Sequence, residues 1–427
     1  MEEWKTYKLA EICDLIPGFA FKSGDFGDFQ SRAIKIGDIQ PPYVNYRTMT
    51  GVNTEAYNKT KLEKYVVRKG DFVLAMTGAT IGKLGLYTED TSAYLNQRVL
   101  LFKPHSDVNK RYIYYSLLSP VFQKYVINHI DSETAQPNIS GKSVSGFEIS
   151  LPSRAEQDRV ANILTTIDDK IELNNRINHN LEQQAQALYK SWFVDFEPFK
   201  GGKFVDSELG LIPEGWVVGC YNDIIDCTVA GDWGKEEQTG NYTHKVSCIR
   251  GCDFEDISCG IKGKTPERYI LEKNFISKQL KNHDIIVEIS GGTPTVSTGR
   301  ICLVSNNLID RYFGDIVCTN FCRVIRPVRG YSSFVYYSWQ NKYDHKVMFG
   351  YENGTSGIKN FQIADFLEKE LVIIPPQTVL ADFQMLVNTY QAAIQRNGNE
   401  RMKCEMVRDS LLPKLMSGEL KINDLTC

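Results

Sequence analysis

The sequence has few of the features that mark membrane, secreted or generally polyanion-coating proteins. No apolar run approaches the roughly 18 residues that a membrane-spanning helix needs. Its start, Met1-Glu-Glu-Trp-Lys, lacks the basic and apolar segments of a secretory signal. Lysine and arginine (49) nearly balance aspartate and glutamate (52), so a polyanion could be bound only by local basic patches. These absences predict a soluble protein of the cytoplasm that makes no contact with a membrane.

Motifs of the common catalytic and metal sites are also missing. A GxSxG nucleophile elbow and an HExxH metal motif are absent, and the six histidines neither cluster nor pair with a nucleophile. The stretch Gly78-Ala-Thr-Ile-Gly-Lys has three residues between its glycines where a phosphate-binding loop has four. Ten of the eleven cysteines follow residue 210 and none forms a CxxC pair, so they are expected to be free thiols. The chain is therefore predicted to be non-catalytic, without a metal or cofactor of its own.

What the chain does contain is an internal repeat. Its 427 residues are enough for two or three domains of about 150 residues. Short motifs from the first half return in the same order in the second half, about 215–225 residues later. The matched pairs are Trp4 with Trp216, Lys69-Gly-Asp-Phe-Val-Leu with Asn282-His-Asp-Ile-Ile-Val, Asn96 to Pro104 with Asn320 to Pro327, and Tyr114-Tyr-Ser with Tyr336-Tyr-Ser. Their constant order and nearly constant offset indicate a duplicated, diverged unit.

Each repeat reads as a β-rich module followed by a long helix. Short apolar or alternating runs between turn-forming residues predict strands at 33–39, 71–76, 84–87 and 99–102. Helical patterns at 110–129 and 332–348 interrupt the strands. Ser153, with Glu156 three residues later, is typical of the start of a helix. We therefore expect an α+β protein with boundaries at 1–152, 153–205, 206–375 and 376–427, in the order module, helix, module, helix.

The two long helices carry apolar residues at alternating spacings of three and four, as helices of a coiled coil do. Both patterns turn polar near the middle, and a polar position fixes the register of pairing at a cost in stability. This shared spacing favours the helices packing on each other in an antiparallel coiled coil, which would give a pseudo-two-fold body. The alternative is that each helix packs on its own module. The predicted pairing residues are Leu164, Ile167, Ile171, Asn174, Asn178, Leu181, Leu188, Val387, Tyr390, Ile394, Asn397, Arg401 and Leu411.

Several of these stretches resemble one known family. Leu151-Pro-Ser-Arg-Ala-Glu-Gln-Asp-Arg-Val, continuing through Ile167-Asp-Asp-Lys to Leu188-Tyr-Lys-Ser-Trp-Phe, resembles the central conserved region of the specificity (S) subunit of type I restriction–modification enzymes. Leu411-Leu-Pro-Lys-Leu-Met-Ser-Gly resembles that family's C-terminal ending, and the Thr77–Lys83 loop and Gln136-Pro-Asn-Ile resemble elements of its target recognition domains. The second module departs from these elements at Ser290-Gly-Gly-Thr and Thr355-Ser-Gly-Ile.

The resemblance implies a function and a set of partners. Each module would be a target recognition domain that reads one half of a bipartite double-stranded DNA target, and the helices would set the spacer and dock other subunits. The family's partners are two methyltransferase subunits and two motor–nuclease subunits, which carry S-adenosylmethionine, ATP and Mg²⁺. A scaffold whose modules bind protein rather than DNA remains the alternative, and the nearly neutral charge is its best support.

Polar side chains in loops are the candidate DNA contacts, because the strands need their apolar residues for the core. In the first module they are Lys22, Lys35, Lys59, Thr77, Thr80, Lys83, Gln97, Arg98, Gln136, Asn138 and Lys142. In the second module they are Arg250, Lys264, Thr293, Thr295, Arg300, Asn320, Arg323, Lys359 and Asn360.

Overall fold

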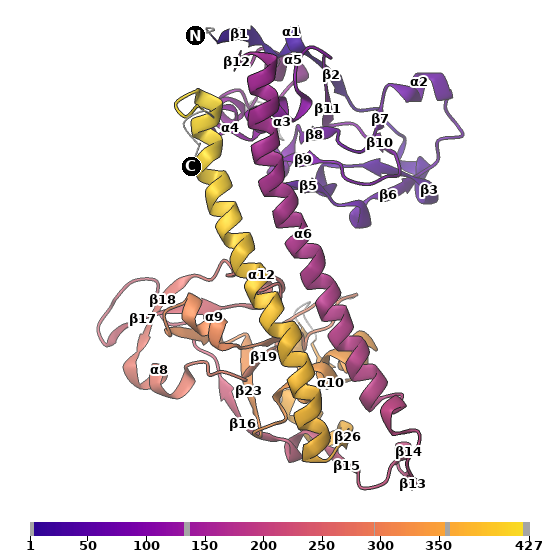
Figure 1. The fold of residues 1–427 in the computed structure, drawn as a ribbon, viewed down its shortest axis with the longest axis vertical. Helices are drawn as coiled ribbons and strands as arrows, with labels where there is room; N and C mark the ends of the chain where they lie inside the picture. The colour runs from indigo at the N-terminus through magenta and orange to yellow at the C-terminus, as the bar shows by residue number, and fades with distance from the viewer. Residues whose placement is uncertain (1–3, 132–136, 294, 355–358, 422–427) are drawn as a thin grey trace. The chain divides into compact units, whose positions relative to one another are not determined.

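A computed structural model describes residues 4–131, 137–293, 295–354 and 359–421. The chain divides into two compact units, and both long helices pass from one unit to the other. The first unit holds residues 1–169 together with 405–427, and the second holds residues 170–404. Each unit therefore contains one β-rich module together with parts of both helices (Figure 1).

The first unit is built on two sheets. The larger has the order β2-β11-β8-β9-β5-β4, the smaller β6-β3-β10-β7, and β1 pairs with β12. The strands of the larger sheet and the outer pair are β2 (Cys13–Pro17), β11 (Val99–Pro104), β8 (Phe72–Ala75), β9 (Leu84–Leu86), β5 (Tyr43–Val44), β4 (Ile39–Gln40), β1 (Lys5–Lys8) and β12 (Glu148–Leu151). Those of the smaller sheet are β6 (Thr50–Val52), β3 (Phe26–Ile34), β10 (Ala93–Leu95) and β7 (Val66–Val67). Its short helices are α1 (Leu9–Ile12), α2 (Lys59–Glu63), α3 (Lys110–Leu118), α4 (Pro120–Asn128) and α5 (Gly141–Ser145).

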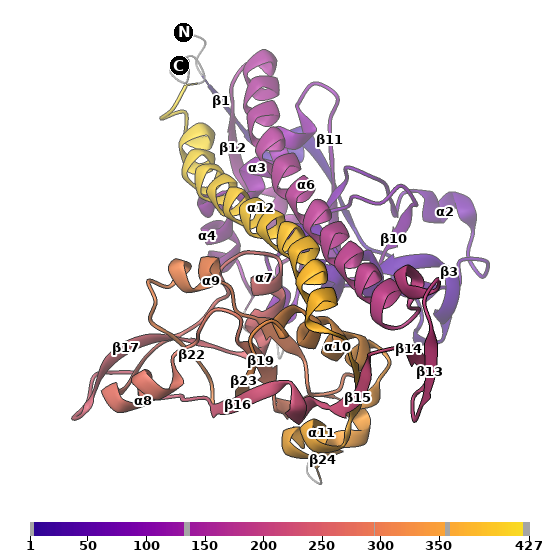
Figure 2. The ribbon, with the colours of Figure 1, turned by 60° about the horizontal axis from the view of Figure 1, so that its bottom comes forward.

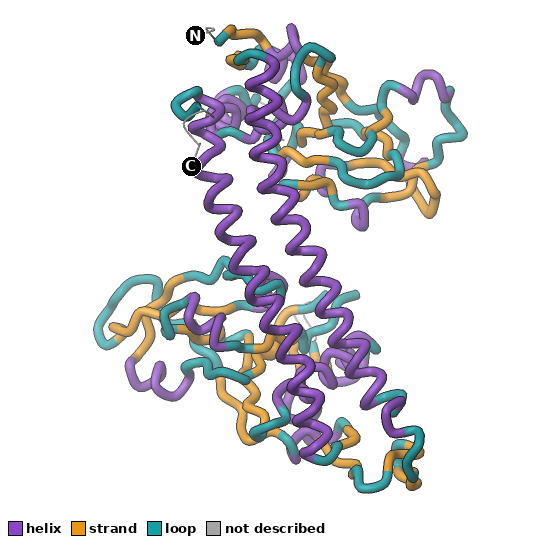
Figure 3. The backbone as a smooth tube through the Cα atoms, in the orientation of Figure 1, coloured by secondary structure: helices purple, strands orange, loops and turns teal. Residues whose placement is uncertain are grey.

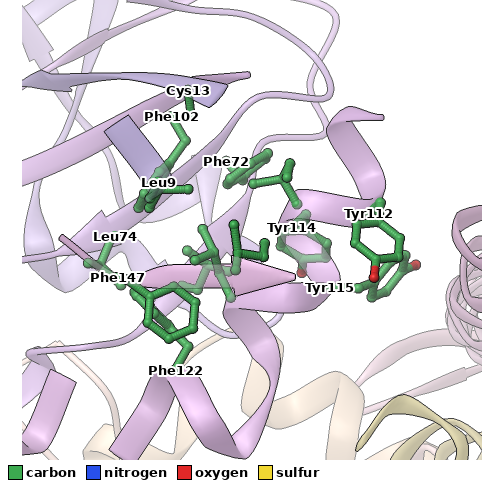
Figure 4. Packing of buried hydrophobic residues seen from close by; sticks show 14 of the residues in the cluster. Leu9, Cys13, Phe72, Leu74, Phe102, Tyr112, Tyr114, Tyr115, Phe122 and Phe147 are labelled. Carbon is green, nitrogen blue, oxygen red and sulfur yellow. The ribbon is translucent and has the colours of Figure 1, made fainter. Parts of the chain in front are cut away.

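Aromatic residues fill the core between the larger sheet and α3 and α4 (Figure 4). Phe72 of β8 stacks on Phe102 of β11 with ring centroids 5.3 Å apart, and Tyr114 of α3 lies against Phe72 at 5.4 Å. Leu164 of the first long helix and Leu412 and Leu415 of the second belong to the same buried cluster. The helix segments of this unit are thus part of its core.

The second unit repeats this plan. Its sheets have the orders β16-β23-β19-β21, β18-β17-β22 and β20-β25-β24, with the pairs β15-β26 and β13-β14 (Figure 2). The strands are β16 (Ile225–Ala230), β23 (Cys322–Pro327), β19 (Ile285–Glu288), β21 (Ile301–Leu303), β18 (Glu267–Leu271), β17 (Tyr242–Ile249), β22 (Ile316–Cys318), β20 (Ser290–Gly291), β25 (Lys359–Phe361), β24 (Glu352–Asn353), β15 (Val217–Cys220), β26 (Leu371–Ile374), β13 (Phe204–Ser207) and β14 (Gly210–Pro213). The helices are α7 (Phe254–Ser258), α8 (Glu272–Lys278), α9 (Asn306–Arg311), α10 (Ser332–Asp344) and α11 (Ile363–Lys369).

Strand pairing confirms the internal repeat and the α+β class. The order β2-β11-β8-β9 of the first unit returns as β16-β23-β19-β21 in the second. The parallel pairing of β3 with β10 corresponds to that of β17 with β22 in the second unit. The antiparallel pair β1-β12 corresponds to β15-β26. The matched sequence motifs therefore lie on or beside equivalent strands and, for Tyr114-Tyr-Ser and Tyr336-Tyr-Ser, on equivalent helices.

Two predicted elements differ from the structure. The helix expected at 110–129 is two helices, because Pro120 begins α4 and the Ser119 hydroxyl accepts a hydrogen bond from the Phe122 amide. The strand expected at 33–39 ends at Ile34, since a 3₁₀ turn occupies Ile36–Asp38. In that turn the Asp38 carboxylate accepts from the Lys35 amide at 2.7 Å.

The two long helices, α6 (Arg154–Phe193) and α12 (Gln377–Ser417), pair in antiparallel orientation (Figure 3). In the second unit the Asn397 amide donates to Asn178 Oδ1 at 2.9 Å and the Asn174 amide to Glu400 at 3.1 Å. In the first unit Arg408 donates to Asp168 at 3.1 Å. Residue numbers thus rise along one helix as they fall along the other, which confirms the predicted antiparallel coiled coil.

The predicted pairing residues are covered to different degrees. Leu164, Ile171, Asn174, Asn178, Val387 and Ile394 are buried, and Ile167, Leu181, Leu188, Tyr390, Asn397, Arg401 and Leu411 are half-buried. The start of α6 also agrees with the sequence, since the Ser153 hydroxyl accepts from the Glu156 amide at 3.4 Å.

Candidate nucleic-acid interface

In the first unit, three loops meet where β8 ends. The Met76 amide donates to the Arg98 carbonyl and the Ile139 amide to the Met76 carbonyl, both at 2.9 Å. The Gly78 amide donates to the Pro137 carbonyl at 3.1 Å. Backbone bonds therefore hold the Thr77–Lys83 loop, the Asn96–Arg98 turn and the Pro137–Ile139 segment together, a set of contacts that we name the loop frame.

A fourth loop enters this frame through a glycine. A side chain at Gly18 would place its Cβ 1.8 Å from the Asn96 carbonyl oxygen, so only glycine fits this close approach. The Gly18 amide donates to the Val99 carbonyl at 2.9 Å and thereby fixes the segment beside β11. The frame thus gathers loops from four separate parts of the sequence.

The frame brings several of the predicted contact residues together. Thr77 is paired with Asn138 in an isolated β-bridge, and Arg98 and Lys83 are exposed on the neighbouring loops. Arg98 has a φ of 67°, a left-handed conformation that costs a non-glycine residue energy and is frequent at functional sites. The Thr77 hydroxyl is buried and has no hydrogen-bond partner among the described residues. Gln97 is exposed in the same turn, whereas Thr80 uses its hydroxyl to bond the Thr77 carbonyl at 3.2 Å.

The second unit builds the same frame. The Ile289 amide donates to the Phe321 carbonyl and the Phe361 amide to the Ile289 carbonyl, both at 2.9 Å. A Cβ on Gly231 would lie 1.8 Å from the Thr319 carbonyl oxygen, as for Gly18 and Asn96. Ser290 pairs with Asn360. Ser290, Phe321 and Asn360 therefore stand where Thr77, Arg98 and Asn138 stand in the first unit.

The remaining predicted contacts of the first unit lie outside the frame. Lys22, Lys59 and Lys142 are exposed at or near the starts of short helices. Lys35 is half-buried; its ammonium donates to the Thr50 hydroxyl at 3.1 Å and lies 3.9 Å above the Phe26 ring. Gln136 lies outside the described residues. Of these side chains, Lys35 is the one whose contacts fit a structural role.

Three cations predicted in the second unit are held by carboxylates. Arg250 pairs with Asp253, Arg300 with Glu288 and Lys359 with Glu352. Burial alone would raise the pKa of Glu352, but hydrogen bonds from Lys359 and from Thr298 hold it below its ordinary value. Arg323 is half-buried, and its Nε has no hydrogen-bond partner among the residues described. The other predicted residues are exposed: Lys264, Thr293, Thr295, Asn320 and Asn360.

The sequence did not single out Phe321 or Glu288. Phe321 is 57% exposed, which is unusual for an aromatic side chain, and it occupies the position of Arg98. Its only sequence signal is its place in the repeat, 223 residues after Arg98. Glu288 ends a wholly apolar strand, Ile285 to Val287, where the pattern predicts a further buried apolar residue.

Neither a metal site nor a membrane span stands out among the residues that the structure describes. Within the described ranges, no three His, Cys, Asp or Glu side chains are grouped so that they could hold a metal ion. Burial raises the pKa of the Cys248 and Cys322 thiols to about 12, so both are protonated near neutral pH and are poor metal ligands. No helix in the described part of the chain is long and apolar enough to cross a membrane.

The fold agrees with comparisons to known proteins. Residues 1–183 match the model of the family described as type I restriction modification DNA specificity domain. The chain as a whole is similar to specificity subunits of type I restriction enzymes, which confirms the resemblance seen in the sequence.

Two relatives and one solved structure illustrate the likeness. The MjaIX specificity subunit of Methanocaldococcus jannaschii is 26% identical over 83% of this chain and 78% of its own length. The HindI specificity subunit of Haemophilus influenzae is 24% identical over 98% of this chain and 100% of its own length. The S subunit of a type I restriction–modification system from M. genitalium has the same fold, with a TM-score of 0.55 at 14% identity over 97% of this chain and 96% of that one.

Proposed function

We propose that this chain is the DNA sequence-recognition subunit of a type I restriction–modification complex. The observation that carries the proposal is the loop frame, which both units build from the same backbone bonds and furnish with different side chains. A constant scaffold with variable polar and aromatic residues suits two different half-sites, because base edges are read by side chains held in fixed loops.

The proposal assigns the segments of the chain as well. Residues 1–152 and 206–375 are the two target recognition domains, and residues 153–205 and 376–427 are the helical regions. The helices dock two methyltransferase subunits, and two motor–nuclease subunits complete the complex. The chain itself performs no chemistry; S-adenosylmethionine, ATP and Mg²⁺ belong to the partner subunits.

Within each recognition domain the side chains have different tasks. In the first domain Arg98 and Asn138, beside the buried Thr77, sit at the frame and read bases, while exposed lysines such as Lys83 hold phosphates. In the second domain Ser290, Phe321 and Asn360 take the places of Thr77, Arg98 and Asn138. The exposed Phe321 suits apolar contact with a thymine methyl group.

Selection of bound duplexes from a randomised library tests the proposal. The complex of this chain with its methyltransferase subunits is used, and a second complex carries another family member's residues in place of 1–150. We expect the first complex to enrich a split motif and the exchange to change one half of that motif. Enrichment of no motif would favour the alternative, in which the modules bind protein. Changes in both halves would contradict independent reading.

A further inference from the structure

The second unit contains an arginine–carboxylate pair at the edge of the loop frame. Arg300 Nε donates to Glu288 Oε2 at 2.8 Å, and Arg300 Nη2 donates to Glu288 Oε1 at 2.7 Å. The Glu288 side chain is 10% exposed and that of Arg300 is 40% exposed. Glu288 immediately precedes Ile289, whose amide and carbonyl form the frame. The carboxylate is therefore buried, while part of the guanidinium faces solvent beside the frame.

The backbone around Glu288 is shaped to admit its carboxylate. A Cβ on Gly251 would lie 2.2 Å from Glu288 Oε1, so any other residue at that position would displace the carboxylate. A Cβ on Gly291 would lie 3.5 Å from the same atom. Glu288 thus occupies a space that exists because position 251 is glycine.

The first unit fills the equivalent space with apolar side chains. In the second unit the Glu288 amide donates to the Arg300 carbonyl, and the Gly299 amide donates to the Glu288 carbonyl. In the first unit the Ala75 amide donates to the Lys83 carbonyl, and the Gly82 amide donates to the Ala75 carbonyl. All four bonds are 2.9 Å long. Ala75 is therefore the counterpart of Glu288, and Lys83 that of Arg300.

Ile36 is the counterpart of Gly251 by the same kind of comparison. The Arg250 amide donates to Asp253 as the Lys35 amide donates to Asp38, which aligns Gly251 with Ile36. Ile36 packs against the buried cluster that contains Ala75. Ile36 in the first unit thus corresponds to Gly251 in the second, and Ala75 corresponds to Glu288. The first unit folds without a carboxylate at this place, so folding of the repeat does not require the carboxylate of Glu288.

A second arginine pair in the same unit behaves differently. Arg326 donates to Asp284, and its side chain is 19% exposed. The first unit keeps this pair as Lys103 with Asp71, in which Asp71 is likewise buried. A pair found in both repeats is a structural feature. The Glu288–Arg300 pair is specific to one repeat and partly open, as a recognition feature would be.

The geometry of the pair leaves a defined set of donors. The carboxylate occupies the side of the guanidinium that carries Nε and one N–H of Nη2. The end with Nη1 and the second N–H of Nη2 remains a fork of parallel donors. Guanine presents O6 and N7 as two neighbouring acceptors in the major groove, and a bidentate arginine is their commonest specific partner.

We infer that Arg300, oriented by Glu288, reads a guanine in the half-site of the second recognition domain. This inference rests on the proposed function and adds a base identity to it. The carboxylate fixes the guanidinium plane before DNA arrives, so fewer rotamers are lost on binding. A phosphate contact would need only the charge, which a lysine also supplies.

Duplex selection with variants of the intact complex tests the inference. R300A is expected to lower the preference for guanine at one position of one half-site by roughly 5- to 100-fold. R300K keeps the charge and is expected to lose most of the same preference. E288Q is expected to lose a smaller part of the preference for guanine at that position. R329A removes an exposed arginine elsewhere in this unit and should leave the motif unchanged.

A double variant separates recognition from folding. G251I/E288A installs the apolar pair of the first unit, so its unfolding midpoint should stay near that of the parent while the guanine preference falls. The inference is overturned if R300A weakens all sequences equally, leaves the motif unaltered or affects a base other than guanine. In each of those cases the parent still enriches a split motif; enrichment of no motif by the parent would instead refute the proposed function.

Discussion

At the scale of single residues, two buried aspartates at equivalent positions anchor the repeats. Asp71 accepts hydrogen bonds from Lys103, from Lys110 and from the Arg68 amide. Burial alone would raise the pKa of Asp71, but these bonds outweigh it and hold the pKa below its ordinary value. Asp284 accepts from Arg326 and from the Lys281 amide, and there burial prevails and raises the pKa. The charged form of Asp71 is thus the better stabilised of the two.

Replacing Asp71 with asparagine is expected to destabilise the first unit by about 1–3 kcal/mol at pH 7, because two lysines lose their charged acceptor. A carboxyl whose folded pKa is depressed stabilises the fold above its ordinary pKa of about 3.9 and loses that contribution as the pH falls through the folded pKa. Urea unfolding at several pH values should therefore show the gap between parent and D71N narrowing toward pH 3. A gap that widens on acidification would contradict the charge assignment.

Lys83 is expected to hold a phosphate, because it is exposed beside the frame and no carboxylate of the described residues pairs with it as Glu288 pairs with Arg300. K83A should weaken binding of all duplexes by a similar factor and lower the slope of log K against log salt by about 1. K200A, which removes an exposed lysine outside both sets of predicted contacts, is the control. A changed sequence preference in K83A would show that Lys83 reads a base instead.

The sequence predicted the scaffold of the site better than its side-chain roles. Thr77, Arg98 and Asn138 were predicted as contacts, and the structure brings them together, because loop positions between apolar strands follow from the hydrophobic pattern. That Arg250, Arg300 and Lys359 are held by carboxylates could not be predicted, since each pairing depends on how the side chains pack. The strand that ends in buried Glu288 departs from the hydrophobic pattern by which the other strands were predicted.

At the scale of elements, α12 has a glycine at its contact with a loop of the second unit. A Cβ on Gly398 would lie 2.0 Å from the Gly260 carbonyl oxygen. Beside this contact the Asn178 amide donates to the carbonyls of Cys259 at 2.9 Å and Ile394 at 3.1 Å. Asn178, in the polar middle of α6, therefore contacts both α12 and a loop of the recognition domain. The heptad pattern predicted the first contact but not the second.

G398A is expected to destabilise the second unit, although glycine to alanine inside an exposed helix ordinarily stabilises by about 1 kcal/mol. The added methyl group cannot fit without moving α12 away from the loop, which would lengthen the hydrogen bonds of Asn178. N388A, at an exposed position of the same helix, should change the unfolding free energy by less than about 0.5 kcal/mol. A G398A protein as stable as the parent in urea would show that this contact is loose.

The long helices and the larger sheets could be predicted from sequence because their periodic patterns extend over many residues. The ends of these elements and the short strands could not be predicted in this way. The division of the 110–129 segment depends on one capping serine and one proline. The two-residue strand β20 has no periodicity to detect, and backbone pairing across the frame alone defines it. Local patterns predict elements that bury a continuous face, whereas long-range backbone bonds decide the rest.

At the scale of the whole molecule, both long helices cross the division between the units, α6 after Asp169 and α12 after Cys404. We propose that their length sets the spacer between the half-sites. The heptad stretch from Leu164 to Trp192 is about 43 Å long at 1.5 Å per residue, comparable to the 34–36 Å of one turn of B-DNA.

Inserting seven residues into each helix at this division keeps the heptad spacing and adds about 10 Å. We expect the half-site sequences to persist while the spacer grows by about three base pairs, at ~3.4 Å each. Methylation mapping of the lengthened variant gives the answer, with a variant that carries seven substitutions at exposed helix positions as the control. An unchanged spacer with full activity would show that the helices do not set the distance.

The central claim is that this chain gives a restriction–modification complex its DNA target. Single-molecule methylome sequencing of cells that express the methyltransferase subunits with and without this chain tests it most directly. The account predicts one split motif, methylated on adenine in both halves, that is present only with the chain. Its second half should contain a guanine whose requirement is relaxed in R300A. Methylation that is the same with and without the chain would contradict the account.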